Sequence, residues 1–289
     1  MIPAAFEYLR PKTIPEAIGF LQQYGDDAKI LSGGQSLIPM MKFRLARPAY
    51  LIDINRVSGL AYIREEDGYL KIGGLTREAD LEHSALIHAK YPILADTSRV
   101  IADPQIRNLA TLAGNLAHGD PANDHPATML ALRAEIVATG PRGERVFPID
   151  SFFVTLFTTQ LERDEIVTEI RIPVLPERSG GAYFKLERKV GDFATAAAAA
   201  QLTIDGGGQC LNVGIGLTNV GATPIRAARA EEFLRGKPLD GASIVQAAQL
   251  ASEEAQPSSD LRGPEEYKRG LVKELTRRAL TRAFERAGK

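Results

Sequence analysis

The chain has 289 residues, of which 44% are hydrophobic and 25% charged, with 35 Lys and Arg against 36 Asp and Glu. This near-neutral composition is typical of a globular protein and gives no indication of binding to nucleic acid or an anionic membrane. The single cysteine, Cys210, excludes an internal disulfide, a four-cysteine zinc site and an iron–sulfur cluster held by this chain alone.

The N-terminus has neither a basic start nor a long apolar run, and no window approaches 18 uninterrupted apolar residues. We therefore expect a protein of the cytoplasm that does not span a bilayer. A length near 300 residues suggests about two domains.

The first 57 residues predict a small α/β unit in which helices and strands alternate. Apolar residues recur with helical spacing from residue 14, where Thr13 is a candidate N-cap and Pro15 lies in the first turn. The predicted elements are helices at 14–24 and 37–42 and strands at 29–31 and 50–54.

A second unit is predicted over residues 58–176, because a cluster of Pro, Ser and Gly follows it. Its predicted elements are strands at 69–73, 135–139 and 165–172, helices at 77–88 and 93–100, and an irregular stretch at 101–126.

Strands followed by helices predict an α+β unit over residues 177–289. A glycine turn at 206–208 makes the second and third strands a hairpin. The predicted elements are strands at 182–188, 196–204 and 209–218 and helices at 226–235, 241–256 and 264–286.

The first candidate binding motif is Ser32-Gly33-Gly34-Gln35-Ser36, directly after a predicted strand. Two glycines there allow positive φ and a close backbone approach to an anion such as a pyrophosphate. The alternative is a tight turn between strand and helix. The P-loop, the Rossmann fingerprint and the nucleophile elbow are all absent, so Ser36 is interpreted as a hydrogen-bond donor.

The second candidate lies in the stretch 101–126, where Thr111–Asn115 offers a hydroxyl, a glycine and an amide. A long irregular stretch inside a domain is usually functional or disordered, and its Ile, Leu and Ala content argues against disorder. A polar loop around an organic ligand is favoured. The alternative is a metal site, without recognised ligand spacing, formed by His118, Asp120, Asp124 and His125.

The third candidate is Lys185–Phe193, where a strand could direct the Lys185 cation at a flavin or a phosphate. The alternative is a charged edge strand that suppresses aggregation.

In their order and spacing, these segments resemble the FAD-binding medium subunits of the molybdenum hydroxylases, the family that includes xanthine dehydrogenase and aerobic carbon monoxide dehydrogenase. The resemblance covers nearly the whole chain, from Phe6–Pro11 through Ile101–Asn108 and Leu217–Val220 to Ser259–Gly263. It implies an α+β protein with the PCMH-type FAD-binding fold. In that fold a small N-terminal α/β unit and a larger α+β unit enclose FAD, and a C-terminal antiparallel sheet with a helical bundle follows.

The resemblance also implies the residues of the FAD site. The diphosphate is expected on the amides of Gly33, Gly34 and Gly114, the adenosine side at Asp124, and the flavin edge at Ile101, Leu161 and Lys185. No catalytic or metal-binding residue is expected. The expected FAD-binding residues are Ile30, Leu31, Ser32, Gly33, Gly34, Gln35, Ser36, Leu37, Ile101, Thr111, Leu112, Ala113, Gly114, Asn115, Asp124, Leu161, Lys185 and Phe193.

Three positions depart from the family's pattern. Ser32 replaces an alanine, and Ala113 replaces a glycine, which is tolerated only where positive φ is not needed. Phe193 stands where relatives often have tyrosine, so it can stack on a flavin but cannot donate a hydrogen bond.

The implied function is that of the flavoprotein subunit of a molybdenum-dependent dehydrogenase. The FAD of this chain would accept electrons from the 2Fe–2S clusters of a small subunit and pass them to an external acceptor, with Lys185 favouring anionic reduced flavin. Substrate, which is carbon monoxide, an N-heteroaromatic or an aldehyde, would be oxidised at a molybdenum cofactor on a large subunit. A dimer of heterotrimers is expected, cytoplasmic or peripheral to the inner face of the membrane.

Two other functions stay open from the sequence. One is a stand-alone flavin reductase of the same fold that uses NAD(P)H. The other is a non-enzymatic nucleotide-binding or scaffold protein.

Overall fold

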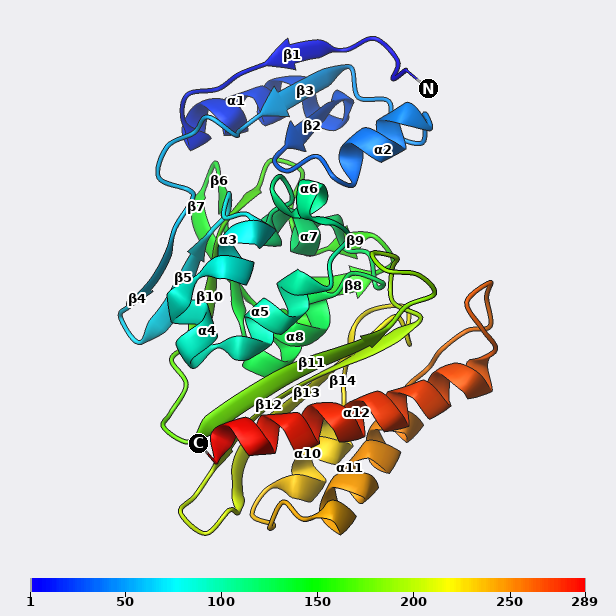
Figure 1. Cartoon of the computed structure of the whole chain (residues 1–289). Coiled ribbons are helices and arrows are strands. Elements are labelled where there is room, and N and C mark those ends of the chain that lie inside the picture. Colours follow the sequence, from blue (N-terminus) through cyan, green and yellow to red (C-terminus); the bar gives the residue numbers. More distant parts are fainter. Residues whose placement is uncertain (1, 289) are drawn as a thin grey trace.

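The computed structural model describes residues 2–288 and stacks three units along the molecule, each built on its own sheet (Figure 1). The N-terminal unit holds three parallel strands in the order β1-β3-β2. As predicted, Thr13 caps the first helix, where its hydroxyl accepts a hydrogen bond from the Glu16 amide. The elements are β1 (Glu7–Leu9), α1 (Ile14–Tyr24), the 3₁₀ turn η1 (Gly25–Asp27), β2 (Ala28–Leu31), α2 (Leu37–Lys42) and β3 (Tyr50–Asp53).

The middle unit wraps helices around a five-stranded antiparallel sheet of order β4-β5-β10-β6-β7. Its strands are β4 (Ile63–Glu66), β5 (Tyr69–Gly73), β6 (Glu135–Gly140), β7 (Gly143–Pro148) and β10 (Ile166–Pro173), with a small ribbon of β8 (Phe153–Thr155) and β9 (Thr158–Thr159). Its helices are α3 (Glu78–His83), α4 (Ala85–Lys90), α5 (Pro92–Arg99), α6 (Pro104–Arg107), α7 (Leu112–His118), α8 (His125–Leu132) and α9 (Ile149–Phe152).

Two predictions for the middle unit are wrong. The helix expected over 77–88 breaks at Ser84, whose backbone is extended. The Ser84 hydroxyl accepts a hydrogen bond from the Ile87 amide and so caps the start of α4. The stretch 101–126 is not irregular throughout, since it contains α6, α7 and the start of α8. Leu112 and Leu116, four residues apart, bury one face of α7 in the core.

The C-terminal unit has an antiparallel sheet of order β11-β12-β13-β14 packed against three helices, as expected. Figure 1 shows α12 lying across this sheet, with α10 and α11 beside it. The elements are β11 (Ser179–Leu186), β12 (Ala196–Ile204), β13 (Cys210–Thr218), β14 (Ile225–Arg226), α10 (Ala228–Leu234), α11 (Gly241–Glu254) and α12 (Glu265–Ala287).

Strand β12 belongs to two cores at once, because both of its faces are buried. Ala197 and Ala199 face the core of the middle unit, whereas Ala196, Ala198 and Ala200 face the core of the C-terminal unit. Alternate residues of a strand point to opposite faces, so a run of alanines lets helices approach the sheet closely from both sides. The middle and C-terminal units therefore share one sheet as their boundary.

Glycines in β13 bring α8 against the same sheet. A Cβ atom on Gly216 would lie 2.0 Å from the carbonyl oxygen of Ala127, and one on Gly214 would lie 2.1 Å from that of Ala131. The backbones of helix and strand are thus in direct contact, which sets how closely α8 approaches the sheet.

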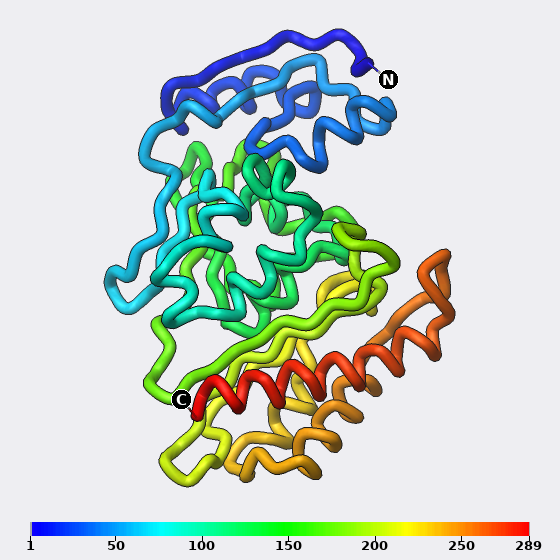
Figure 2. The backbone as a smooth tube through the Cα atoms, viewed as in Figure 1, coloured from blue at the N-terminus to red at the C-terminus, as the bar shows by residue number. Residues whose placement is uncertain are grey.

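The path of the chain keeps its two ends in different units, the N-terminus beside the first sheet and the C-terminus at the end of α12 (Figure 2). Among residues 2–288, no helix combines the length and the apolar composition that crossing a membrane requires. Cys210 is buried at the start of β13, and burial raises the pKa of its thiol to about 11.

The contact at Gly216 gives a first prediction. Gly216→Ala should lower the free energy of unfolding by about 1–3 kcal/mol, since the new methyl group meets backbone that must move. Gly206→Ala is the control, because a Cβ there meets nothing within 4 Å and the change should stay within about 0.5 kcal/mol. Urea unfolding of both variants measures the difference, and equal midpoints would contradict the contact.

Candidate functional site

A cleft of about 630 Å³ lies between the N-terminal and middle units and is also lined by Lys185 and Gly191–Phe193 of the C-terminal unit. Its size is usual for small-molecule sites. Both glycine-containing loops contribute to its walls. Leu31 and Leu112 do not line it, and Leu112 is buried in the core of the middle unit. The other predicted residues line it: Ile30, Ser32, Gly33, Gly34, Gln35, Ser36, Leu37, Ile101, Thr111, Ala113, Gly114, Asn115, Asp124, Leu161, Lys185 and Phe193.

The first loop, Ser32–Ser36, leaves β2 and enters α2 with Gly34 at φ +73°. The amides of Gly33, Gly34, Gln35 and Ser36 have no hydrogen-bond acceptor among residues 2–288. The Gln35 side chain instead donates to the carbonyl of Gly33 at 3.0 Å. Consecutive free amides in a turn form a concave site for an anion.

The second loop is organised by Thr111, the N-cap of α7. Its hydroxyl accepts a hydrogen bond from the Gly114 amide at 3.1 Å and lies 3.0 Å from the Ser32 hydroxyl. The Gly114 amide therefore already has a protein partner, contrary to the role expected for it on the diphosphate. Ala113 lies inside α7, where φ is negative, so its methyl group fits without strain.

Asn115 gives an independent sign of a ligand. It lines the cleft, and its Oδ1 is buried without a hydrogen-bond partner in the described residues. Leaving a buried polar atom unpaired is costly, so this atom fits a polar group of a bound molecule.

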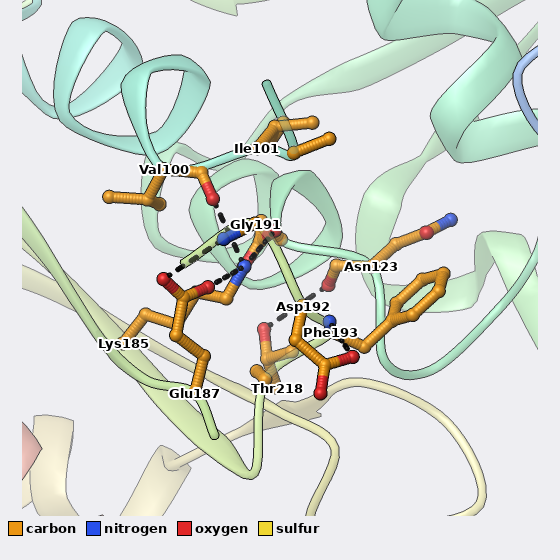
Figure 3. A network of polar contacts seen from close by, with 12 residues as sticks. Val100, Ile101, Asn123, Lys185, Glu187, Gly191, Asp192, Phe193 and Thr218 are labelled. Carbon is orange, nitrogen blue, oxygen red and sulfur yellow. Dashed lines mark hydrogen bonds and ion pairs between the residues drawn. The ribbon is translucent and has the colours of Figure 1, made fainter. Parts of the chain in front are cut away.

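The far end of the cleft is built around Lys185, whose side chain is only 3% exposed. Its Nζ lies 3.1 Å from Asp124 Oδ2 and 3.2 Å from Glu187 Oε2. It also donates to the carbonyl of Val100 at 3.1 Å, as Figure 3 shows. The Tyr183 hydroxyl donates to Asp124 Oδ1 at 2.5 Å. The cation is thus enclosed by two carboxylates.

These contacts correct the roles expected for Asp124 and Lys185. Burial raises the pKa of Asp124, and the nearby Lys185 opposes that rise. Because the two groups form one ion pair, they cannot serve the adenosine and flavin ends of an extended dinucleotide. Since Asp124 and Glu187 compensate its charge, Lys185 is not the free cation expected to favour an anionic flavin.

Of the residues expected at the flavin edge, Ile101 lies next to Val100, whose carbonyl accepts a hydrogen bond from Lys185, and Leu161 lines the same cleft. Ile101 precedes Ala102, which adopts φ +45°, and a Cβ on Gly191 would lie 3.0 Å from the Ala102 carbonyl. Phe193 is 46% exposed and lines the cleft (Figure 3). Asp192 beside it pairs with Arg262 at 3.4 Å, so the segment before α12 holds this loop between β11 and β12.

The proposed alternative of a metal site has no support in residues 2–288, where no group of three or more His, Cys, Asp or Glu could hold a metal ion. His125 instead lies in the core, with Nε2 at 2.6 Å from Glu78 Oε2. His118 lines the cleft, and burial lowers its pKa, which favours the neutral imidazole.

Further lining residues were not among those expected to bind FAD. Some lie within the candidate segments 101–126 and Lys185–Phe193, and others come from strand ends and helix faces that carry no short motif. Only folding brings these separate segments together. They include Lys29, Met40, Ile54, Gly74, Ala102, Ile106, Ala110, Ala117, Asn123, Phe157, Glu165, Ile166, Val167, Gly191 and Asp192.

The Lys185 cluster gives a second prediction. Lys185→Met leaves Asp124 and Glu187 without their cation and should destabilise the fold by about 3–5 kcal/mol at pH 8. An unpaired buried carboxyl has a higher pKa in the folded than in the unfolded chain. The loss of stability in Lys185→Met is therefore largest at high pH. It becomes smaller as the pH falls toward the pKa that the carboxyl has in the unfolded chain.

Urea unfolding at pH 8 and pH 5 measures this deficit, with Lys273→Met at an exposed position of α12 as the control. The control should stay within about 0.5 kcal/mol of the unmodified chain at both pH values. A Lys185→Met deficit that does not shrink at pH 5 would show that the carboxylates do not need this cation.

Comparison with known proteins identifies two family regions. Residues 4–175 match the family described as FAD binding domain in molybdopterin dehydrogenase, and residues 181–283 match the CO dehydrogenase flavoprotein C-terminal domain. The carbon monoxide dehydrogenase medium chains of Hydrogenophaga pseudoflava and Afipia carboxidovorans are 44% and 46% identical to this chain, and 99% of each sequence is covered in both comparisons.

Solved structures agree with these matches. Reconstituted CO dehydrogenase from Oligotropha carboxidovorans superposes with a TM-score of 0.96 at 46% identity, covering 99% of this chain and 100% of the other. Quinoline 2-oxidoreductase from Pseudomonas putida 86 gives 0.92 at 32% identity, covering 99% of each chain. The chain therefore belongs to the FAD-binding medium subunits of the molybdenum hydroxylases, the flavoprotein component of molybdenum-dependent dehydrogenases.

Proposed function

We propose that this chain holds FAD in the cleft between the N-terminal and middle units and relays electrons from the 2Fe–2S clusters of a small subunit to an external acceptor. The observation that carries the proposal is the row of free amides at Gly33–Ser36, residues that line the cleft together with Asn115, whose buried Oδ1 is unpaired among the described residues. Bound FAD supplies a redox centre that accepts and releases electrons.

The first glycine loop would hold the diphosphate. Its free amides offer donors that cost no rearrangement, and Gly34 allows the left-handed turn that directs them. Thr111 would act indirectly, since its hydroxyl contacts both Ser32 and the Gly114 amide.

At the other end, Ile101 and Phe193 would flank the flavin ring with apolar surface. Lys185 would act as a positioning residue that holds the Asp124 carboxylate in the cleft wall. An electron relay needs no proton-transfer catalyst in this chain, and we assign none.

We propose that the chain folds as units 1–57, 58–176 and 177–289 and assembles with a small and a large subunit as a dimer of heterotrimers. Clusters must come from a partner, because one buried cysteine cannot ligate them. The large subunit would oxidise carbon monoxide, an N-heteroaromatic or an aldehyde at its molybdenum cofactor. The names of the medium chains at 44% and 46% identity support carbon monoxide among these.

Purification of the tagged full chain from its native host tests this function. We expect two further subunits together with FAD, iron and molybdenum, and flavin absorbance that bleaches when the oxidisable substrate is added without oxygen. A chain that purifies alone and oxidises NAD(P)H with an organic substrate would instead establish the stand-alone reductase. A colourless chain that binds no FAD would establish the scaffold protein.

The first loop gives a further prediction. Gly34→Val should reduce the FAD content of the purified protein to less than about a tenth, because a β-branched residue is strained at φ +73°. Its Cβ would also lie 2.7 Å from Ile38 Cδ1 and 2.9 Å from Leu31 Cδ1. The clash is thus with the chain's own side chains, before any contact with the diphosphate.

Gly68→Val is the matched control, since Gly68 has φ +80° in a turn where a Cβ meets nothing within 4 Å. It should carry the same backbone strain and keep its FAD. Full FAD occupancy in Gly34→Val would mean that this loop does not hold the cofactor.

A further inference from the structure

The two loops that face the cleft belong to different units, yet their backbones touch. A Cβ on Gly33 would lie 2.4 Å from the carbonyl oxygen of Leu109 and 2.7 Å from Ala110 Cα. Only a glycine allows this approach. The separation of the two loops is therefore set at this backbone contact, together with the hydrogen bond between the Ser32 and Thr111 hydroxyls.

A chain of hydrogen bonds closes the same contact from outside the cleft. Arg77 donates through Nη1 to the Leu109 carbonyl at 2.6 Å and through Nη2 to Asn55 Oδ1 at 2.6 Å. Asn55 Nδ2 in turn donates to the Ser32 carbonyl at 2.8 Å. One guanidinium and one amide thus connect the carbonyl before Gly33 to the loop that Gly33 touches.

The N-terminal unit fixes Asn55 in its rotamer. Asn55 Nδ2 also donates to Asp53 Oδ1 at 2.7 Å, and the Asn55 amide donates to the same oxygen at 2.9 Å. The Tyr8 hydroxyl donates to the other oxygen of Asp53. Burial raises the pKa of Asp53, but the hydrogen bonds from Tyr8 and Asn55 outweigh it and hold that pKa below its usual value.

Neither Arg77 nor Asn55 lines the cleft, so neither contacts a ligand there directly. The first loop has few bonds within itself, because its four amides are free. Its carbonyls accept hydrogen bonds from the Gln35 side chain, from the amides of Ile38 and Met40 in α2, and from Asn55 Nδ2. The conformation that presents these amides must be held by residues outside the loop.

We propose that Asn55 and Arg77 form a clamp that holds the diphosphate-binding loop Ser32–Ser36 against the segment Leu109–Ala110 across the boundary between the units. The inference rests on the proposed placement of the FAD diphosphate on that loop. The fork of the guanidinium is required, since two acceptors on different units lie at the ends of one planar group. Lysine keeps the charge but cannot bridge both acceptors with the same geometry.

The test compares Arg77→Gln, Arg77→Lys, Asn55→Ala and the double variant Asn55→Ala/Arg77→Gln in the assembled enzyme after removal of FAD. Titrations with FAD and with ADP give the dissociation constants. ADP contains the diphosphate but no flavin, so the clamp predicts that each variant weakens both ligands by the same factor, about tenfold to a hundredfold. Because both residues form one bridge, the double variant should be no weaker than the weaker single variant.

Arg226→Gln is the control for a general loss of stability, because Arg226 pairs with Glu231 and Asp150 and none of the three lines the cleft. It should lower the urea midpoint of the FAD-free protein without changing either dissociation constant. Size-exclusion chromatography checks that all variants keep the same subunits.

Three outcomes would overturn the clamp. Arg77→Lys with unchanged affinity would mean that charge, not the bridge, matters. Loss of FAD affinity with unchanged ADP affinity would place the effect at the flavin end. A dissociation constant of the double variant that rises by the product of the two single-variant factors would show that Asn55 and Arg77 make two independent contacts. If the unmodified enzyme itself binds neither FAD nor ADP, the proposed function fails instead.

Discussion

The site depends on one close contact, the approach of the Gly33 backbone to the carbonyl of Leu109. A Cβ atom on Gly33 would lie 2.4 Å from that carbonyl oxygen, so main chain from two units meets at this part of the cleft wall. In the first loop, the amides of Gly33–Ser36 have no acceptor among the described residues and are free to bind an anion. The carbonyls of Ser32 and Leu109 beside this contact need hydrogen-bond donors. Arg77 and Asn55 supply those donors on the outside, which leaves the inside for a ligand.

Small residues also allow close backbone packing in the rest of the molecule. Glycines in β13 seat α8 on the third sheet, and the alanines of β12 fill the space between two cores. Asp124 lies directly before α8, and Lys185 lies near the end of β11 in that sheet. The ion pair between them therefore depends on a sheet that belongs mainly to the C-terminal unit. Breaking such a buried pair is costly, which ties the shape of the cleft to packing far from it.

Local signals in the sequence predicted most of the elements. Thr13 before an amphipathic run, glycine turns and alternating strands each depend on neighbours within a few residues, and the structure has these elements where they were expected. The break at Ser84 and the helix α7 were not predicted. Ser84 caps α4, and α7 is stabilised by burial of Leu112 and Leu116, four residues apart, in the core. Both effects depend on packing that a short stretch of sequence does not show.

The loops of the candidate site could be predicted from the sequence, but the side-chain contacts that join distant parts of it could not. Glycine loops at 32–36 and 111–115 are visible as motifs, and both line the cleft. The bridge from Arg77 to Asn55 spans 22 positions and the pair of Lys185 with Asp124 spans 61, and no spacing rule joins them. A resemblance gave Asp124 and Lys185 opposite ends of the cofactor, which their 3.1 Å contact corrects.

A density map of the assembled enzyme with its cofactor would locate FAD directly. We expect FAD in the cleft, with phosphate oxygens within hydrogen-bonding distance of the Gly33 and Gly34 amides and the flavin ring near Ile101 and Phe193. Density for FAD elsewhere, or a diphosphate that makes no contact with Ser32–Ser36, would contradict it.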